Sequence, residues 1–317
     1  MKIKPKRLEK GQTIGVVSPA SPSFYKSEIV RGISTLKEWG FNVVTSDNLS
    51  RRYAYLAGPD KARAGDLNEM FSREDIDAIF VTQGGYGSAR LLRYLDFDII
   101  RENPKIFIGF SDITSIHLAI LKKTGLVTFH GPGMSRFNTQ DLTPYTEEQL
   151  FKALSSPDPI GEIVPADETK WINIFRGGKA RGELVGGNLS LICASLGTPY
   201  EIDTAGKIFF FEELETEPWL IDHMLTHLLN AGKLQEAAGI VVGECKNCEP
   251  SKLNPGFHVT FSLEDVLEDF LTPLGVPVIF GLPLGHTRDL ATVPLGVEAC
   301  IDGDEGSLFI EECATVD

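Results

Sequence analysis

The sequence predicts an α/β protein of two domains, the first of which is built on a doubly wound, mostly parallel sheet. Three observations support this fold class. The chain has 317 residues, which is more than one typical core needs and suits two domains. Its expected strands are short apolar runs that do not alternate with polar residues, as in strands buried on both faces. Segments with helical spacing separate these runs, which is the pattern of a parallel sheet covered by helices.

The first half of the chain repeats this alternation up to about residue 135. Ile29, Ile33 and Leu36 share one face of an expected helix, and Gly40 is expected to end it. Three further helices are expected, at residues 60–71, 88–95 and 113–125. The expected strands are residues 13–19, 41–45, 77–87, 105–112 and 126–133, the third of them running into a glycine-rich turn.

Small, polar or glycine-rich segments follow four of these strands. They read SPASP, TQGGYG, GFSD and HGPG. In doubly wound sheets, ligands bind beyond the carboxyl ends of the strands. We therefore expect the rim of an active site at these four segments.

Residues 136–180 are polar and irregular, which predicts a linker between a first domain at residues 1–135 and a second at residues 181–317. The second domain is expected to be α/β with a mixed sheet, and the active site is expected between the two domains. Its expected elements are a strand, glycine turn and helix over 182–197, strands at 207–215, 239–244 and 276–281, a helix through Ile221 and Leu228, a helix at 263–271, and a hairpin at 296–312 around Gly303.

Composition and charge exclude several classes of partner. The formal net charge is −14, and so acidic a chain repels phosphate backbones, which disfavours nucleic acid. The longest apolar runs are far shorter than the roughly 20 residues that a membrane-spanning helix needs. The basic N-terminus has no apolar stretch behind it, unlike a signal peptide. We expect a cytoplasmic protein that binds neither membrane nor nucleic acid.

The cysteines favour neither a disulfide framework nor a metal site. There are five of them, an odd and sparse set. Cys245 and Cys248 form one CxxC, but a zinc site would need a second pair at suitable spacing. A redox motif should open a helix, whereas Pro250 and the residues after it predict a loop. We expect two thiols at the end of a loop, and no cofactor or metal.

Ser111 is a candidate nucleophile. It lies in GFSDITSIHLAI, directly after an expected buried strand and at the start of a helix. Backbone N–H groups and the positive end of the helix would lie beside it, as an oxyanion hole requires. An ordinary N-cap suits this position equally well. Ile113 stands where the G-x-S-x-G elbow of α/β-hydrolases has its second glycine, so that fold is not matched.

Histidines and carboxylates offer several candidates for a base and its partner. His286 follows an expected strand, and His130 occupies a similar strand end. His223 and His227 have the i, i+4 spacing of a possible metal pair. Glu212 and Glu213 end the apolar run KIFFF and could be either cleft residues or a strand-end charge pair. The residues alone leave these alternatives open.

Seven motifs together resemble the LD-carboxypeptidase family, which includes murein tetrapeptide carboxypeptidases and microcin-C self-immunity peptidases. They follow the same order over nearly the whole chain, which makes the resemblance specific. The motifs are GQTIGVVSPASP, VTQGGYGSARLL, IGFSD, HGPG, GELVGGNLSLI, IFFFEELETEPWLIDHML and PVIFGLPLGHTRDLATVPLGV.

The resemblance implies a serine carboxypeptidase with a Ser–Glu–His triad. Its nucleophile would be Ser111, its acid Glu212 and its base His286. The neighbouring Glu213 is the alternative to Glu212. The backbone amides of Asp112 and Gly85 would form the oxyanion hole. The family also implies a homodimer.

The implied substrate is a small peptide with a bond between an L and a D residue, typically a murein tetrapeptide that loses its terminal D-alanine during cell-wall recycling. A free carboxylate must then be bound, for which Arg288 and Arg176 are candidates. Cleavage of a peptidyl-nucleotide antibiotic is the alternative activity, with Trp171 as the aromatic platform. A non-catalytic small-ligand-binding protein and a metallohydrolase using His223 and His227 are the remaining alternatives.

Overall fold

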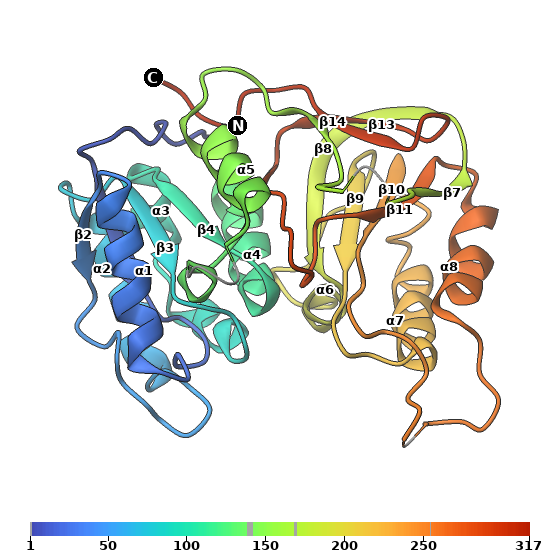
Figure 1. Ribbon diagram of the computed structural model, residues 1–317, viewed down its shortest axis with the longest axis horizontal. Helices are drawn as coiled ribbons and strands as arrows, with labels where there is room; N and C mark the ends of the chain where they lie inside the picture. The colour runs from blue at the N-terminus through green and yellow to red at the C-terminus, as the bar shows by residue number, and fades with distance from the viewer. Residues whose placement is uncertain (1, 138–141, 168–169, 254) are drawn as a thin grey trace. The chain divides into compact units, whose positions relative to one another are not determined.

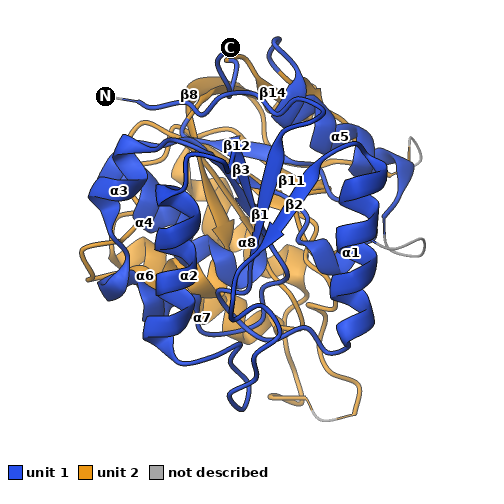
Figure 2. Ribbon diagram, turned by 90° about the vertical axis from the view of Figure 1, so that its left-hand side faces the viewer, with its two compact units in different colours: residues 1–159, 288–296, 313–317 blue, residues 160–287, 297–312 orange. Residues whose placement is uncertain are grey.

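The computed structural model describes residues 2–137, 142–167, 170–253 and 255–317 (Figure 1). The chain forms two compact units. The N-terminal unit comprises residues 1–159, 288–296 and 313–317, and the C-terminal unit comprises residues 160–287 and 297–312 (Figure 2). Each unit contains a sheet of its own.

The N-terminal unit is built on a six-stranded sheet with the order β12-β5-β4-β3-β1-β2. All neighbours are parallel except β12, which pairs antiparallel with β5 and aligns Val293 with His130. The doubly wound, mostly parallel sheet expected from the sequence is confirmed. The strands are β1 (Thr13–Val17), β2 (Asn42–Thr45), β3 (Ala78–Val81), β4 (Ile106–Gly109), β5 (Thr128–His130) and β12 (Val293–Leu295).

Helices cover both faces of this sheet. Figure 2 shows α1 and α5 on one side of the strands and α2, α3 and α4 on the other. The central strands β3 and β4 are therefore buried along their whole length, which explains their continuous apolar sequences. The α-helices are α1 (Lys26–Glu38), α2 (Asp60–Ser72), α3 (Phe97–Glu102), α4 (Thr114–Thr124) and α5 (Pro144–Ser155).

Short 3₁₀ segments complete this unit: η1 (Ser88–Tyr94), η2 (Ser111–Ile113) and η3 (Met134–Arg136). The helix expected at residues 88–95 is thus a 3₁₀ helix. The N–H of its first residue, Ser88, donates to the carboxylate of Asp112 at 2.7 Å. The start of this 3₁₀ helix is therefore capped by a residue from outside the helix.

The C-terminal unit contains an eight-stranded mixed sheet with the order β6-β14-β13-β8-β9-β10-β11-β7. Strands β8 to β11 are parallel to one another, and the outer strands pair antiparallel. The expected mixed sheet is confirmed. The strands are β6 (Gly161–Ile163), β7 (Asn173–Arg176), β8 (Lys179–Asn188), β9 (Ile208–Glu212), β10 (Gly239–Gly243), β11 (Val278–Leu282), β13 (Glu298–Asp302) and β14 (Ser307–Ile310).

The helices of this unit are α6 (Leu189–Ser195), α7 (Pro218–Asn230), α8 (Leu263–Leu271) and the 3₁₀ segment η4 (Thr272–Leu274). Helix α7 packs against both α6 and α8. Its buried face contains Ile221, Leu225 and Leu228, as helical spacing predicts.

The segment expected to be a linker, residues 136–180, contains regular structure instead. Thr143 caps α5, its hydroxyl accepting the Thr146 N–H at 3.2 Å, and Pro144 occupies the first turn. A Thr-Pro pair before a helix is a start signal that the polar composition obscured. Strands β6 and β7 lie in the same segment. The expected second domain at 181–317 also differs from the C-terminal unit, because residues 288–296 and 313–317 return to the N-terminal unit.

In the described ranges, no helix is both long enough and apolar enough to cross a membrane.

Candidate active site

Ser111 lies just beyond the carboxyl end of β4, in a backbone conformation that is unusual for its residue type. Its φ is 63°, in the left-handed region. For an L-residue with a Cβ this region costs about 1–2 kcal/mol. Such strain concentrates at functional sites, where the surrounding structure imposes it. The side chain is half-buried, and α4 begins three residues later.

A glycine loop lies against Ser111. A Cβ at Gly84 would come within 2.9 Å of the Ser111 Cβ and 3.2 Å of the Asp112 nitrogen, so only glycine fits there. The next residue, Gly85, has a φ of 102° and is exposed. No hydrogen bond joins its N–H to another residue in the described ranges. The loop therefore presents an amide close to the residues around Ser111.

Asp112, directly after Ser111, is buried and attached to the far end of the same loop. Its carboxylate accepts the Ser88 N–H at 2.7 Å, and its backbone carbonyl accepts the Ser88 hydroxyl. Burial raises the pKa of the Asp112 carboxyl, and the hydrogen bonds from Ser88 oppose that rise. The side chain thus serves as a structural anchor between residues 111–112 and 87–88.

His117, to which the sequence assigned no role, is fully buried under the end of β4. Its Nε2 lies 2.8 Å from the Gly109 carbonyl and its Nδ1 lies 2.9 Å from the Thr128 hydroxyl. A carbonyl oxygen can only accept, so Nε2 carries the proton and Nδ1 accepts from Thr128. Burial lowers the pKa of His117 to about 3. A neutral imidazole therefore connects β4 to β5 two residues before Ser111.

Glu212 and His286 form a buried pair in the C-terminal unit. Glu212 ends β9 with 0% of its surface exposed. His286 follows β11, and its Nδ1 lies 2.7 Å from Glu212 Oε2. A carboxylate acceptor at Nδ1 places a proton on that nitrogen, so in the neutral ring Nε2 has the lone pair. This is the arrangement of a general base held by an acid.

Glu213 makes a different set of contacts. Its carboxylate accepts from the Ser190 N–H and hydroxyl, at 2.8 and 2.7 Å, and from the Leu214 N–H at 2.9 Å. Asn188 Nδ2 donates to Glu213 Oε1 at 3.1 Å and to Glu212 Oε1 at 3.2 Å. The neighbouring carboxylates therefore differ: Glu213 anchors the start of α6, and Glu212 meets the histidine.

Two residues of this network were not found from the sequence. Asn188 caps α6 and donates to both carboxylates. Its position before the helix in GGNLS is the sequence feature that could have indicated this role. Glu244, at the end of the apolar run GIVVG, accepts the Thr287 hydroxyl and pairs with Lys170 Nζ at 2.5 Å. It therefore holds the residue that follows His286.

Two family models match the chain. The model of the LD-carboxypeptidase N-terminal domain matches residues 14–131, and that of the C-terminal domain matches residues 181–301. The chain belongs to the LD-carboxypeptidase family. Ser111 lies inside the first matched region, and Glu212 and His286 lie inside the second.

Similar proteins match nearly the whole length of this chain. A probable murein peptide carboxypeptidase of Bacillus subtilis is 42% identical, covering 97% of the chain and 94% of its own length. The solved structure of the microcin C7 self-immunity protein MccF has a TM-score of 0.89 at 28% identity. The match covers 99% of this chain and 100% of that structure's chain. The solved structure of a muramoyltetrapeptide carboxypeptidase from Oxalobacter formigenes has a TM-score of 0.82 at 29% identity. The match covers 96% of this chain and 100% of that structure's chain.

The two arginines expected to bind a carboxylate lie in different units. Arg288 belongs to the N-terminal unit, where its carbonyl accepts from Arg136 Nη1 at 3.3 Å. Arg176 ends β7 in the C-terminal unit, and its Nη1 donates to the Thr272 carbonyl at 3.4 Å. Trp171, just before β7, is 89% exposed.

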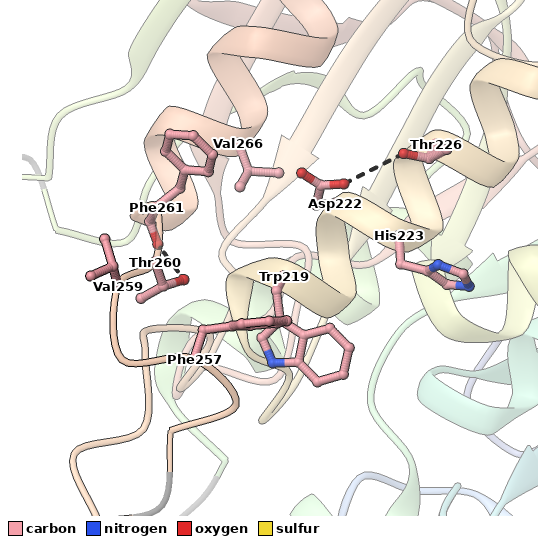
Figure 3. Close-up of a pocket in the computed structure, with 9 residues that line it drawn as sticks. All are labelled: Trp219, Asp222, His223, Thr226, Phe257, Val259, Thr260, Phe261 and Val266. Atoms are coloured by element: carbon pink, nitrogen blue, oxygen red, sulfur yellow. Dashed lines mark hydrogen bonds between the residues drawn. The ribbon is translucent and has the colours of Figure 1, made fainter.

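A separate surface pocket of about 390 Å³ lies between α7 and the segment before α8 (Figure 3). Trp219 contacts Phe257 edge to face, with 5.6 Å between the ring centroids. Asp222 accepts from Thr226 at 3.4 Å on the same helix. His223 also lines this pocket, whereas Glu212 and His286 do not.

The remaining candidates concern metals and thiols. Within the described ranges, no three His, Cys, Asp or Glu side chains are grouped to hold a metal ion. All five cysteines are free thiols. Cys245 and Cys248 follow β10 in a loop, as the sequence predicts. An S–H···S contact with Cys248, together with burial, raises the pKa of Cys245.

Proposed function

We propose that this LD-carboxypeptidase is a serine peptidase that hydrolyses the bond between an L and a D residue, releasing terminal D-alanine from a murein tetrapeptide. The observation that carries the proposal is the 2.7 Å contact between His286 Nδ1 and Glu212 Oε2. A buried carboxylate on Nδ1 orients the imidazole and stabilises its protonated form, which general-base catalysis requires.

In the proposed mechanism, His286 Nε2 takes the proton of the Ser111 hydroxyl, and Ser111 Oγ attacks the peptide carbonyl. The resulting imidazolium gives that proton to the leaving amine of D-alanine. Water, activated by the same imidazole, then hydrolyses the acyl-enzyme. Glu212 accepts the hydrogen bond from His286 Nδ1 and stabilises the imidazolium. The left-handed φ of Ser111 supports its role, since nucleophiles of serine hydrolases often occupy strained turns after a strand.

We assign the oxyanion hole to the N–H groups of Asp112 and Gly85. The Gly85 N–H has no acceptor in the described ranges, and its loop packs against Ser111. Two such donors stabilise the charge that develops on the carbonyl oxygen of the tetrahedral intermediate.

The proposed substrate follows from the relatives. One is named a probable murein peptide carboxypeptidase and another a muramoyltetrapeptide carboxypeptidase. The free carboxylate of D-alanine needs a cationic partner, for which Arg288 and Arg176 are our candidates. We also propose a cytoplasmic role in cell-wall recycling and a homodimeric state.

The decisive experiment measures D-alanine release from an L-Ala-D-Glu-diamino acid-D-Ala tetrapeptide. Wild type, Ser111→Ala and His286→Ala are compared at equal folded concentration. We expect release by the wild type and a loss of at least about 10³-fold in kcat for each variant. Release that survives Ser111→Ala would refute the assigned nucleophile.

A second substrate class is favoured by one observation, the exposure of Trp171. An exposed indole can stack on a nucleobase. Solved structures of MccF include a complex with aspartyl sulfamoyl adenosine. If this chain acts on such conjugates, it will hydrolyse an acyl sulfamoyl adenosine faster than the tetrapeptide, and Trp171→Ala will raise KM for the conjugate alone.

A further inference from the structure

Arg63 is a charged residue in the interior of the N-terminal unit. It lies in the first turn of α2, and its side chain is 0% exposed. The guanidinium forms an ion pair with Asp60, with 2.7 Å between Nη2 and Oδ1. A buried charge needs complete hydrogen bonding to be tolerated, and one carboxylate uses only part of its five donors.

The other donors bind backbone carbonyls in three separate segments. Arg63 Nε donates to Gly58 O at 2.9 Å, and Nη1 donates to Gly87 O at 3.0 Å and also to Pro19 O. The Pro19 segment follows β1, and the Gly87 segment follows β3. One planar side chain therefore fastens two loops at the carboxyl edge of the sheet. A lysine ammonium, a single point of charge, cannot span all of these positions.

The loop that Arg63 fastens contains Gly85. Besides Arg63, Ser21 holds it, because the Ser21 N–H donates to Gly84 O at 3.2 Å and the Ser21 hydroxyl accepts the Tyr86 N–H at 3.1 Å. At the other end, Ser88 is bound to the carboxylate of Asp112. The contact of Arg63 with Gly87 O lies between these two attachments.

We propose that Arg63 is a positioning residue that holds the 84–87 loop so that the Gly85 N–H lies where the oxyanion forms. This inference rests on the proposed function, because it assumes that Ser111 is acylated and that Gly85 binds the oxyanion. Arg63 touches no substrate. It keeps the donor in place before the reaction, so no loop reorganisation accompanies the development of charge.

The experiment compares Arg63→Lys with wild type, and uses Arg73→Lys as the matched control, because Arg73 is the partly exposed C-cap residue of the same helix. Four quantities are measured: kcat and KM for D-alanine release, the rate at which a fluorophosphonate labels Ser111, and the affinity of the uncleaved tetrapeptide in a Ser111→Ala background. We expect Arg63→Lys to lower kcat and the labelling rate together, by about 10²-fold, as loss of an oxyanion donor does. KM and peptide affinity should change less than threefold, and Arg73→Lys should match wild type.

A purely structural role predicts a lower melting temperature for Arg63→Lys with unchanged kcat and labelling, and that result would overturn the inference. If Arg63→Lys does not fold, Asp60→Asn is the second variant, because it weakens the same anchor. It should lower kcat and labelling about fivefold with KM unchanged, and unchanged kcat would likewise refute the role. Failure of the proposed function itself is distinguishable, since wild type would then show neither D-alanine release nor labelling at Ser111.

Discussion

The Nδ1 atom of His286 lies 2.7 Å from Oε2 of Glu212, whereas the carboxylate of Glu213, the next residue, is surrounded by donors from Asn188, Ser190 and Leu214. Two adjacent glutamates at one strand end therefore have different surroundings. Glu212 contacts the imidazole of His286, and Glu213 accepts hydrogen bonds at the start of α6. Their substitutions should have separable consequences.

Glu212→Gln should lower kcat by about 10³ to 10⁴-fold with little loss of stability. An amide at this position no longer stabilises the imidazolium and can favour the wrong tautomer of His286. Glu213→Gln should instead cost about 1–3 kcal/mol in the free energy of unfolding, because an amide cannot accept all of the hydrogen bonds. Urea unfolding and D-alanine release on both variants check this. Equal losses of kcat would contradict the assignment.

Ser111→Gly and Ser111→Ala should both be inactive, yet differ in stability. Alanine keeps the Cβ that makes a φ of 63° unfavourable, and glycine removes it. The glycine variant should be about 0.5–1 kcal/mol more stable than the alanine variant. Chemical denaturation at neutral pH measures the difference. A more stable alanine variant would show that the backbone at residue 111 is not strained.

Gly84→Ala should lower activity while the protein still folds. The new methyl group would come within 2.9 Å of the Ser111 Cβ, so the loop or the serine must move. We expect a loss of kcat of about 10²-fold, as for a displaced catalytic group. Gly65→Ala is the control, since nothing lies within 4 Å of its added Cβ, and it should keep full activity. An active Gly84→Ala would show that the loop tolerates the shift.

His117 should make the protein sensitive to acid. Its folded-state pKa of about 3 lies below the ordinary value of 6.5, so the unfolded chain takes up a proton first as the pH falls. The stability conferred by the neutral form is complete above about pH 6.5 and is lost as the pH falls toward about 3. At pH 5 the loss is about 2 kcal/mol.

The comparison variant for this effect is His117→Gln, which does not titrate. Unfolding free energies of wild type and variant are measured in urea at pH 7.5 and pH 5.0. The drop between the two pH values should be about 2 kcal/mol larger for the wild type. Equal drops in both proteins would mean that His117 does not cause the acid sensitivity.

The sequence predicts those strands that are long apolar runs and those helices that end at a glycine. The sequence predicts β1, β3, β4, β9 and β10, because a strand covered on both faces consists of consecutive apolar residues. Strands β6 and β7 were missed because they lie at sheet edges, where few apolar residues are needed. Strand β12 was missed because it pairs with β5 from more than 160 residues away, and no local pattern encodes such a contact.

The candidate site was predictable only as separate pieces. Ser111, Glu212 and His286 each stand at a strand end, which is visible in the sequence. The choice between Glu212 and Glu213 depended on which carboxylate faces each donor, a property of side-chain direction rather than of pattern. Arg63 looks like any helical arginine until its burial is known.

The order in which the chain visits its two units has a consequence for biosynthesis. Residues 288–296 contain β12, the strand that covers the free edge of β5, yet they are translated after most of the C-terminal unit. A nascent N-terminal unit on the ribosome therefore has an unpaired sheet edge next to His130 until nearly the whole chain has been made. Exposed strand edges pair readily with other chains. Expressing residues 1–159 alone should accordingly give aggregated protein. In the full chain, β12 would prevent this aggregation by pairing with the exposed edge of β5.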